Sequence, residues 1–221
     1  MNEKLEALAK EIFACKSCRY WKDYQEFRGK KGTMAKASQW LYWAPNEILS
    51  RKVPAPSKAT KALPFKYNGK SKIMFISMRP SMGEFLWSYT YPLPEALIEN
   101  RLSKKIFRVE GDTWVCYSGP LITDLVKCRG EAGKKMKRIP ENCIRFLKRE
   151  IEIVNPEAIV AMGNDAKHLL SRYSNELGIE GLFKKENTIW HYAYAKRMNR
   201  IDEYKKQFRE VMKKTQKIMR R

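Results

Sequence analysis

Two pairs of cysteines, separated by more than a hundred residues, limit the ways in which this chain can fold. Cys15 and Cys18 form a CxxC step near the amino terminus, and Cys128 and Cys143 flank a basic segment in the middle of the chain. A cluster held by all four thiolates would tie these segments together, as a structural metal centre does. Thiolate ligands suit zinc or an iron–sulfur cluster, so the spacing alone leaves the metal open. We interpret the fifth cysteine, Cys116, as a buried thiol.

The composition indicates one basic domain. At 221 residues the chain is long enough for a single α/β domain, residues 1–221, with room for an insertion. Its 45 Lys and Arg residues against 24 Asp and Glu residues give a formal net charge of +21. This excess favours a polyanionic partner, above all nucleic acid. A lysine-rich surface without such a partner is the alternative.

The chain has no stretch that approaches the ~20 apolar residues of a membrane helix. Its first residues are amphipathic and charged rather than typical of a signal sequence. We therefore expect no membrane association and a cytoplasmic, monomeric protein. In a reducing compartment the cysteines are expected to be metal ligands or buried thiols rather than disulfides.

Hydrophobic periodicity predicts strands that alternate with helices. Buried strands are expected at 73–78, 121–126, 157–162 and 188–191, a hairpin at 105–117, and helices at 3–14, 94–104, 141–154, 165–173 and 201–219. This alternation is typical of a parallel sheet that helices cover on both faces. We predict a three-layer α/β/α sandwich with a short, mainly parallel four-stranded sheet.

Two basic segments stand outside this pattern. Residues 25–70 form a loop-rich insertion in which lysines alternate with Trp40, Trp43 and Tyr67. Basic charge with flat rings can bind nucleic acid, and the same aromatic residues could instead pack the loop onto the core. The carboxyl-terminal helix, about 200–219, is also basic, and it is either a phosphate-binding surface or a solvated face.

The segment from Gly119 to Leu170 resembles the family 4 uracil-DNA glycosylases. In that family a strand ending in T-N-x-x-K-C-R-P precedes a helix with a cysteine and a P-x-x-I-V-A-x-G strand. Further matches in the same order are the early CxxC, the strand and turn at 73–81, and the segment HYAYAKR at 191–197. The resemblance implies the glycosylase fold, DNA as partner, and base excision repair as the process, so that the protein would be nucleoid-associated. It also implies that Cys15, Cys18, Cys128 and Cys143 hold a structural 4Fe-4S cluster, with zinc as the alternative.

The first family motif is altered in this chain. The family places a carboxylate or amide near the attacking water, whereas this chain has Ser77-Met78-Arg79-Pro80-Ser81. Glu84 is the nearby substitute for the missing catalytic group. We assign Ser77 and Met78 to base recognition, with packing as the other reading of Met78, and Arg79 and Ser81 to DNA contacts.

The second motif changes the expected base. Asp124 stands where the resemblance predicts the Asn that pairs with uracil. An ionised carboxylate only accepts hydrogen bonds, so it would repel uracil O4 and accept from an exocyclic amine. We therefore expect a non-uracil or modified base. A helix cap or a salt-bridge partner is the structural alternative for Asp124.

The third motif matches the family more closely than the first two. The resemblance implies that His191 donates a hydrogen bond to O2 of the leaving base, while a purely structural histidine is the alternative. We assign Lys196 and Arg197 to DNA binding. The sequence thus predicts a DNA glycosylase of altered base specificity. The alternatives are a catalytically inactive nucleic-acid-binding protein with the same fold and cluster, and a zinc-stabilised basic scaffold protein.

Overall fold

The computed structural model describes residues 3–18, 65–78, 92–109, 114–127 and 138–219. Its helices are α1 (Glu3–Ala14), α6 (Pro92–Glu99), α7 (Glu141–Val154), α8 (Asn164–Arg172), α9 (Ser174–Leu177), α10 (Tyr192–Arg197) and α11 (Ile201–Met219). Its strands are β1 (Phe65–Tyr67), β2 (Ile73–Ser77), β3 (Lys104–Val109), β4 (Trp114–Gly119), β5 (Leu121–Asp124), β6 (Ala158–Met162) and β7 (Phe183–Ile189).

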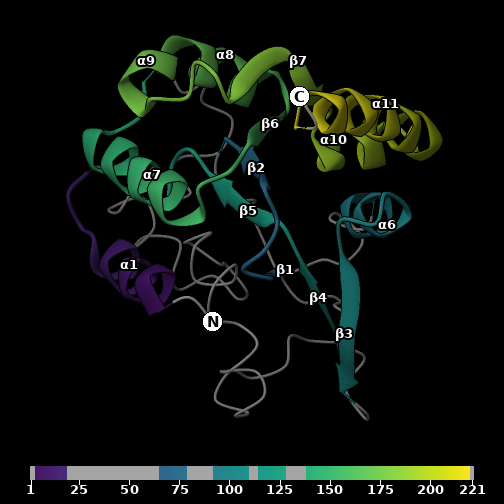
Figure 1. Ribbon diagram of the computed structural model, residues 1–221, viewed down its shortest axis with the longest axis horizontal. Coiled ribbons are helices and arrows are strands. Elements are labelled where there is room, and N and C mark those ends of the chain that lie inside the picture. The colour runs from purple at the N-terminus through teal and green to yellow at the C-terminus, as the bar shows by residue number, and fades with distance from the viewer. Residues whose placement is uncertain (1–2, 19–64, 79–91, 110–113, 128–137, 220–221) are drawn as a thin grey trace.

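A four-stranded sheet forms the centre of the fold, in the order β5-β2-β6-β7 (Figure 1). Each neighbouring pair in this sheet is parallel. The predicted short, mainly parallel four-stranded sheet is therefore confirmed. Because the strands are parallel, their carboxyl ends meet at one edge of the sheet, where ligands bind in open α/β folds.

Helices cover both faces of this sheet, as the near-continuous apolar strands require. On β2, Met74 and Ile76 point to one face and Ile73 and Phe75 to the other, following the period of two in a strand. The first face packs against α7, α8 and α9, and the second against α6, α10 and α11 (Figure 1). The α/β/α layering expected from the alternating pattern is thus present.

The opening helix α1 has the predicted bounds and packs on α7. Its buried Leu8 and Ile12 contact Phe146. Arg149 of α7 donates a hydrogen bond of 2.8 Å to Oε1 of Glu11 at the surface of the same contact. This packing delivers Cys15 and Cys18, which follow the helix, to the amino-terminal end of α7, where Cys143 lies.

A second sheet, β1-β4-β3, was not expected from the sequence beyond its hairpin. The predicted hairpin is confirmed as antiparallel β3 and β4, and β1 pairs with β4 in parallel. The predicted helix over 94–104 is wrong at its carboxyl end. Arg101 adopts a left-handed backbone with φ 58°, and the N–H of Leu102 bonds to the Leu97 carbonyl, so the helix closes and β3 begins at Lys104.

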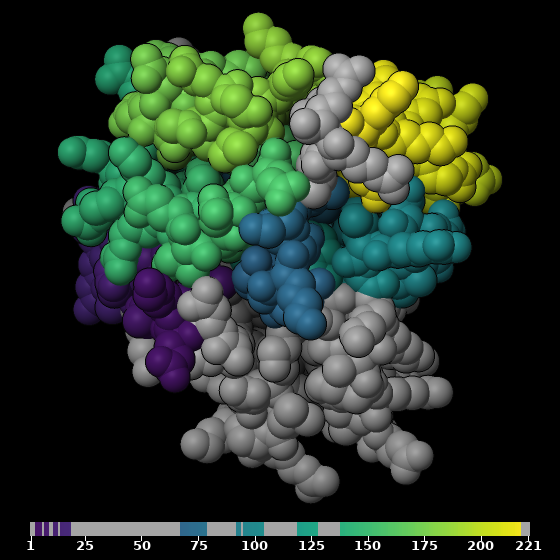
Figure 2. All heavy atoms as spheres, viewed as in Figure 1, coloured from purple at the N-terminus to yellow at the C-terminus, as the bar shows by residue number. Residues whose placement is uncertain are grey.

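Helix α11 packs beside α6 and forms one corner of the surface in Figure 2. Lys205 of α11 forms ion pairs with Glu95 and Glu99 of α6, while Lys206, Lys213, Lys214 and Lys217 are exposed. Nowhere in the described ranges is a helix both long and apolar enough to cross a bilayer.

Candidate active site and cysteine cavity

Ser77 and Asp124 are the last residues of two neighbouring strands. They are directly paired in the register of β2 and β5, and both side chains are buried. The chain after β2 continues to α6 on one face of the sheet, and the chain after β5 continues to α7 on the other. Such a point, where successive connections leave to opposite faces, is where open α/β sheets form a ligand crevice.

Asp124 is a buried acidic residue, only 8% exposed. Burial raises the pKa of this carboxyl from 3.8 to about 7, and the nearby Lys127 ammonium and Ser77 hydroxyl oppose the shift only in part. The carboxyl therefore changes its charge near neutral pH. When ionised it offers only acceptors, and when protonated it offers one donor and one acceptor.

His191 lies at the same edge of the sheet, two residues after the end of β7. Met162 of β6 pairs with Ile189 of β7, so Gly163 and His191 emerge next to each other. A Cβ atom on Gly163 would lie 3.3 Å from the Cβ of His191, and Gly163 also has φ 94°. Glycine is required here because a side chain would be strained by the backbone and would press on the histidine.

The imidazole of His191 has a defined tautomer. Its Nδ1 accepts a hydrogen bond of 3.2 Å from the Ala193 N–H, which caps α10. Desolvation lowers the pKa of His191 to about 4, with a further lowering by Arg197. The ring is therefore neutral at pH 7, with its proton on Nε2, where it can donate.

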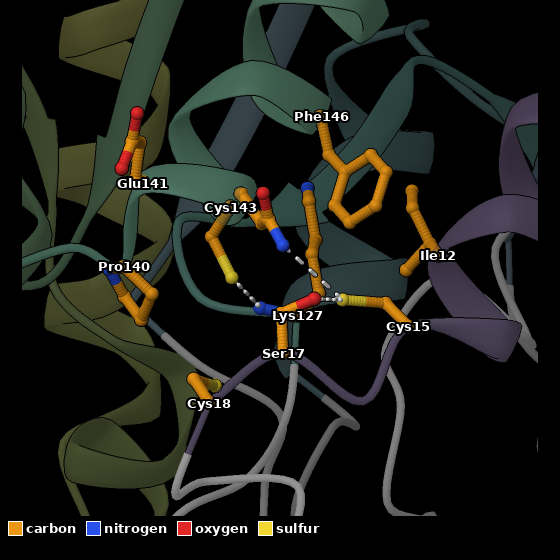
Figure 3. Close-up of a pocket in the computed structure, with 10 residues that line it drawn as sticks. Ile12, Cys15, Ser17, Cys18, Lys127, Pro140, Glu141, Cys143 and Phe146 are labelled. Carbon is orange, nitrogen blue, oxygen red and sulfur yellow. Dashed lines mark hydrogen bonds between the residues drawn. The ribbon is translucent and has the colours of Figure 1, made fainter.

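Three of the four predicted cysteine ligands line one cavity of about 180 Å³ (Figure 3). Cys15 and Cys18 come from the segment after α1, and Cys143 comes from the first turn of α7. Asn142 Nδ2 lies 3.9 Å from the sulfur of Cys15, and the main-chain N–H of Lys127 donates to the sulfur of Cys143 at 3.5 Å. The fourth predicted ligand, Cys128, lies outside the described residues.

The chemistry of this cavity fits a thiolate-bound metal centre. Three sulfurs face one space, and two N–H groups point at them, as is common around iron–sulfur clusters. Within the described part of the chain, no three His, Cys, Asp or Glu groups are drawn together closely enough to hold an ion. Burial raises the pKa of the Cys143 thiol to about 11, so a bound metal would have to favour its thiolate.

The other predicted site residues do not form a single group in the described part of the structure. Met78 is half-buried and packs against the core cluster on the α7 face, which agrees with its packing alternative. Lys196 and Arg197 are exposed on α10. Arg79, Ser81, Glu84 and most of the predicted insertion lie outside the described residues.

Sequence reasoning missed two buried charged residues that lie next to this site. Lys127 and Glu150 form a buried ion pair, with 2.6 Å between Nζ and Oε2. Glu150 lies on the inward face of the amphipathic α7, and an acidic residue at such a position is the signal that could have revealed it. Lys127 stands beside Cys128 and Arg129, and nothing in the sequence distinguishes it from the many other basic residues.

Two comparisons agree with this geometry. The type-4 uracil-DNA glycosylase of Sulfurisphaera tokodaii is 22% identical over 196 residues, which cover 86% of this chain and 69% of that protein. The family model of the uracil DNA glycosylase superfamily matches residues 55–216, which include the three strand ends with Ser77, Asp124 and His191. The chain belongs to the uracil DNA glycosylase superfamily, close to its type-4 members.

Proposed function

We propose that this protein hydrolyses the N-glycosidic bond of a flipped base in DNA and prefers an amino-bearing or modified base to uracil. The observation that carries the proposal is the buried Asp124 at the carboxyl end of β5, paired with Ser77 at the end of β2. A flipped base is read through its Watson–Crick edge, so the group that faces this edge decides which base is accepted.

The charge of Asp124 determines what it can read. As a carboxylate it accepts from an exocyclic amine, such as that of cytosine or adenine, and repels the O4 carbonyl of uracil. Because its pKa is raised to about 7, this discrimination is strongest above neutral pH. Below neutral pH the protonated acid offers a donor and an acceptor, which is the hydrogen-bonding pattern of asparagine.

His191 would stabilise the leaving base. Its neutral ring donates through Nε2, because Nδ1 is occupied by the Ala193 N–H. A neutral donor can approach the O2 atom as negative charge develops there, and such preorganised donors are a main source of catalytic stabilisation.

The attacking water needs a carboxylate or amide, and Glu84 is the candidate in this chain. The resemblance places that group in the segment Ser77-Met78-Arg79-Pro80-Ser81, which here contains no Asp, Glu or Asn. This replacement favours a second candidate function, a nucleic-acid-binding protein that has kept the fold without catalysis. Both functions predict DNA binding through Arg79, Ser81, Lys196 and Arg197, with affinity that falls steeply with salt.

Cys15, Cys18, Cys128 and Cys143 would hold a 4Fe-4S cluster, with zinc as the alternative. When bound, the cluster supplies four metal–thiolate bonds that join the segment after α1 to the start of α7. Hydrolysis of an N-glycosidic bond needs no electron transfer, so we assign these cysteines a structural role.

The test is abasic-site formation on oligonucleotides that contain uracil, hypoxanthine, xanthine, cytosine or modified cytosines. We expect release of an amino-bearing or modified base at pH 8, loss of this activity in His191→Ala, and faster uracil release in Asp124→Asn. Efficient uracil release that Asp124→Asn leaves unchanged would contradict the proposed base preference. Tight, salt-sensitive DNA binding without release of any base would support the non-catalytic function.

A further inference from the structure

A buried ion pair joins the end of strand β5 to helix α7. Lys127 is 1% exposed and Glu150 is 0% exposed, and their charged atoms are 2.6 Å apart. Moving two charges out of water costs about as much free energy as their attraction returns. A buried ion pair is therefore weak evidence that its role is to stabilise the fold. The hydrogen bonds of Lys127 and Glu150 indicate another role for the pair.

The ammonium of Lys127 is fully engaged by three acceptors. It donates to Glu150 Oε2 at 2.6 Å and to Thr123 Oγ1 at 2.8 Å. Its third bond, at 2.7 Å, goes to the main-chain oxygen of Asp124. An ammonium has three hydrogens, so these bonds use all of them and hold the side chain of Thr123 and the backbone of Asp124 at the end of β5.

The same residue contacts the cysteine cavity. The main-chain N–H of Lys127 donates to the sulfur of Cys143, and Lys127 lines the cavity with Cys15 and Cys18 (Figure 3). A single residue thus connects the cysteines with the backbone of Asp124. Glu150 anchors this connection from α7, the helix that also carries Cys143.

We propose that Lys127 and Glu150 are positioning residues that hold Asp124 in place for base reading and link its position to the cysteine cavity. This inference rests on the proposed function, because only a base-reading Asp124 makes its placement matter for selectivity. Neither residue is assigned a contact with the substrate.

The decisive variant removes the charges and keeps the volume. In Thr123→Val/Lys127→Met/Glu150→Leu, the whole polar network becomes apolar, and such replacements of buried ion pairs are often neutral or stabilising. The fold should therefore persist while the Asp124 carbonyl loses its donor. The matched control is Glu11→Gln/Arg149→Met, which removes the exposed ion pair between α1 and α7 without contact to β5.

Two readouts separate positioning from a merely structural role. For the preferred base, we expect kcat to fall about ten-fold to a hundred-fold, with KM and DNA affinity within about two-fold of the wild type. The NMR titration of a ¹³C-labelled Asp124 carboxyl should shift to higher pH, because the Lys127 cation that lowers its pKa is gone. The control variant should match the wild type in both measurements.

A folded triple variant with an unchanged kcat would overturn the inference, because the titration shift alone reports only the lost charge of Lys127. If the triple variant does not fold, Thr123→Val alone removes one acceptor of the ammonium and should lower kcat by a smaller amount. If the wild type releases no base, the proposed function fails, and the ¹³C shift of the Asp124 main-chain carbonyl, which loses its donor in the triple variant, still shows whether Lys127 holds this backbone.

Discussion

The carboxyl group of Asp124 should make the stability of this protein depend on pH. The side chain is buried, and Lys127, the cation that lowers its pKa, donates its hydrogen bonds to Glu150, to Thr123 and to the main chain of Asp124 itself. Burial is therefore the dominant influence, and it raises the pKa from 3.8 to about 7.

The sign of the effect follows from proton binding. Between about pH 4 and pH 7 the folded protein keeps the proton on Asp124 and the unfolded chain releases it. The contribution of Asp124 to stability is therefore full below about pH 4 and is lost as the pH rises to about 7. Since one pKa unit is worth ~1.4 kcal/mol, the raised pKa corresponds to about 4 kcal/mol in the free energy of unfolding.

Asp124→Asn is the matched control, because asparagine has nearly the same shape and does not titrate. We would measure the free energy of unfolding by urea for both proteins between about pH 4 and pH 8. The wild-type value minus the variant value should fall by about 4 kcal/mol as the pH rises. A difference that stays constant over this range would show that Asp124 ionises as it does in an unfolded chain, and would refute the reasoning.

Four further predictions concern the site. The rate of uracil release relative to cytosine release should fall about ten-fold per pH unit above pH 7 in the wild type and stay flat in Asp124→Asn, as measured by abasic-site formation. His191→Ala should lower kcat by about 10² to 10³ without weakening DNA binding in an anisotropy titration, because it removes a donor to the leaving base. Gly163→Ala should lower kcat and the melting temperature, because φ 94° and the His191 Cβ at 3.3 Å leave no strain-free place for the methyl group. Cys15→Ser should reduce both the bound iron in metal analysis and the melting temperature, and zinc in place of iron in the wild type would overturn the cluster assignment.

The central sheet was predictable because strands that are buried on both faces consist almost entirely of apolar residues. The apolar runs at 73–77 and 158–162 admit few readings other than buried strands, and α7 shows a regular apolar face. Strand β7 was predicted too short. The strand begins at Phe183. Its next residues, Lys184, Lys185 and Glu186, are exposed and charged, so this part of the strand shows no apolar pattern. The segment after His191 carries no helix prediction from its apolar pattern and is helical, with the histidine as its cap.

The site was predictable only to the level of individual positions. Asp124 and His191 follow from the resemblance, whereas their pKa values depend on burial by residues distant in sequence. The partner of Lys127 is Glu150, 23 residues away, and no local pattern connects the two. Charge counting treats Lys127 as part of a basic surface, but its side chain is enclosed and neutralised within the core.

The hydrogen bonds of Lys127 leave the Asp124 carboxyl available for the base contact that we propose. If the ammonium bonded to the Asp124 carboxyl, the pair would stay ionised at neutral pH and its acceptors would be occupied. Glu150 and Thr123 instead hold the ammonium, so the carboxyl stays available and its proton is lost only near pH 7. The four residues from Asp124 to Lys127 therefore combine the proposed base-reading group with the cation that donates to its main-chain oxygen.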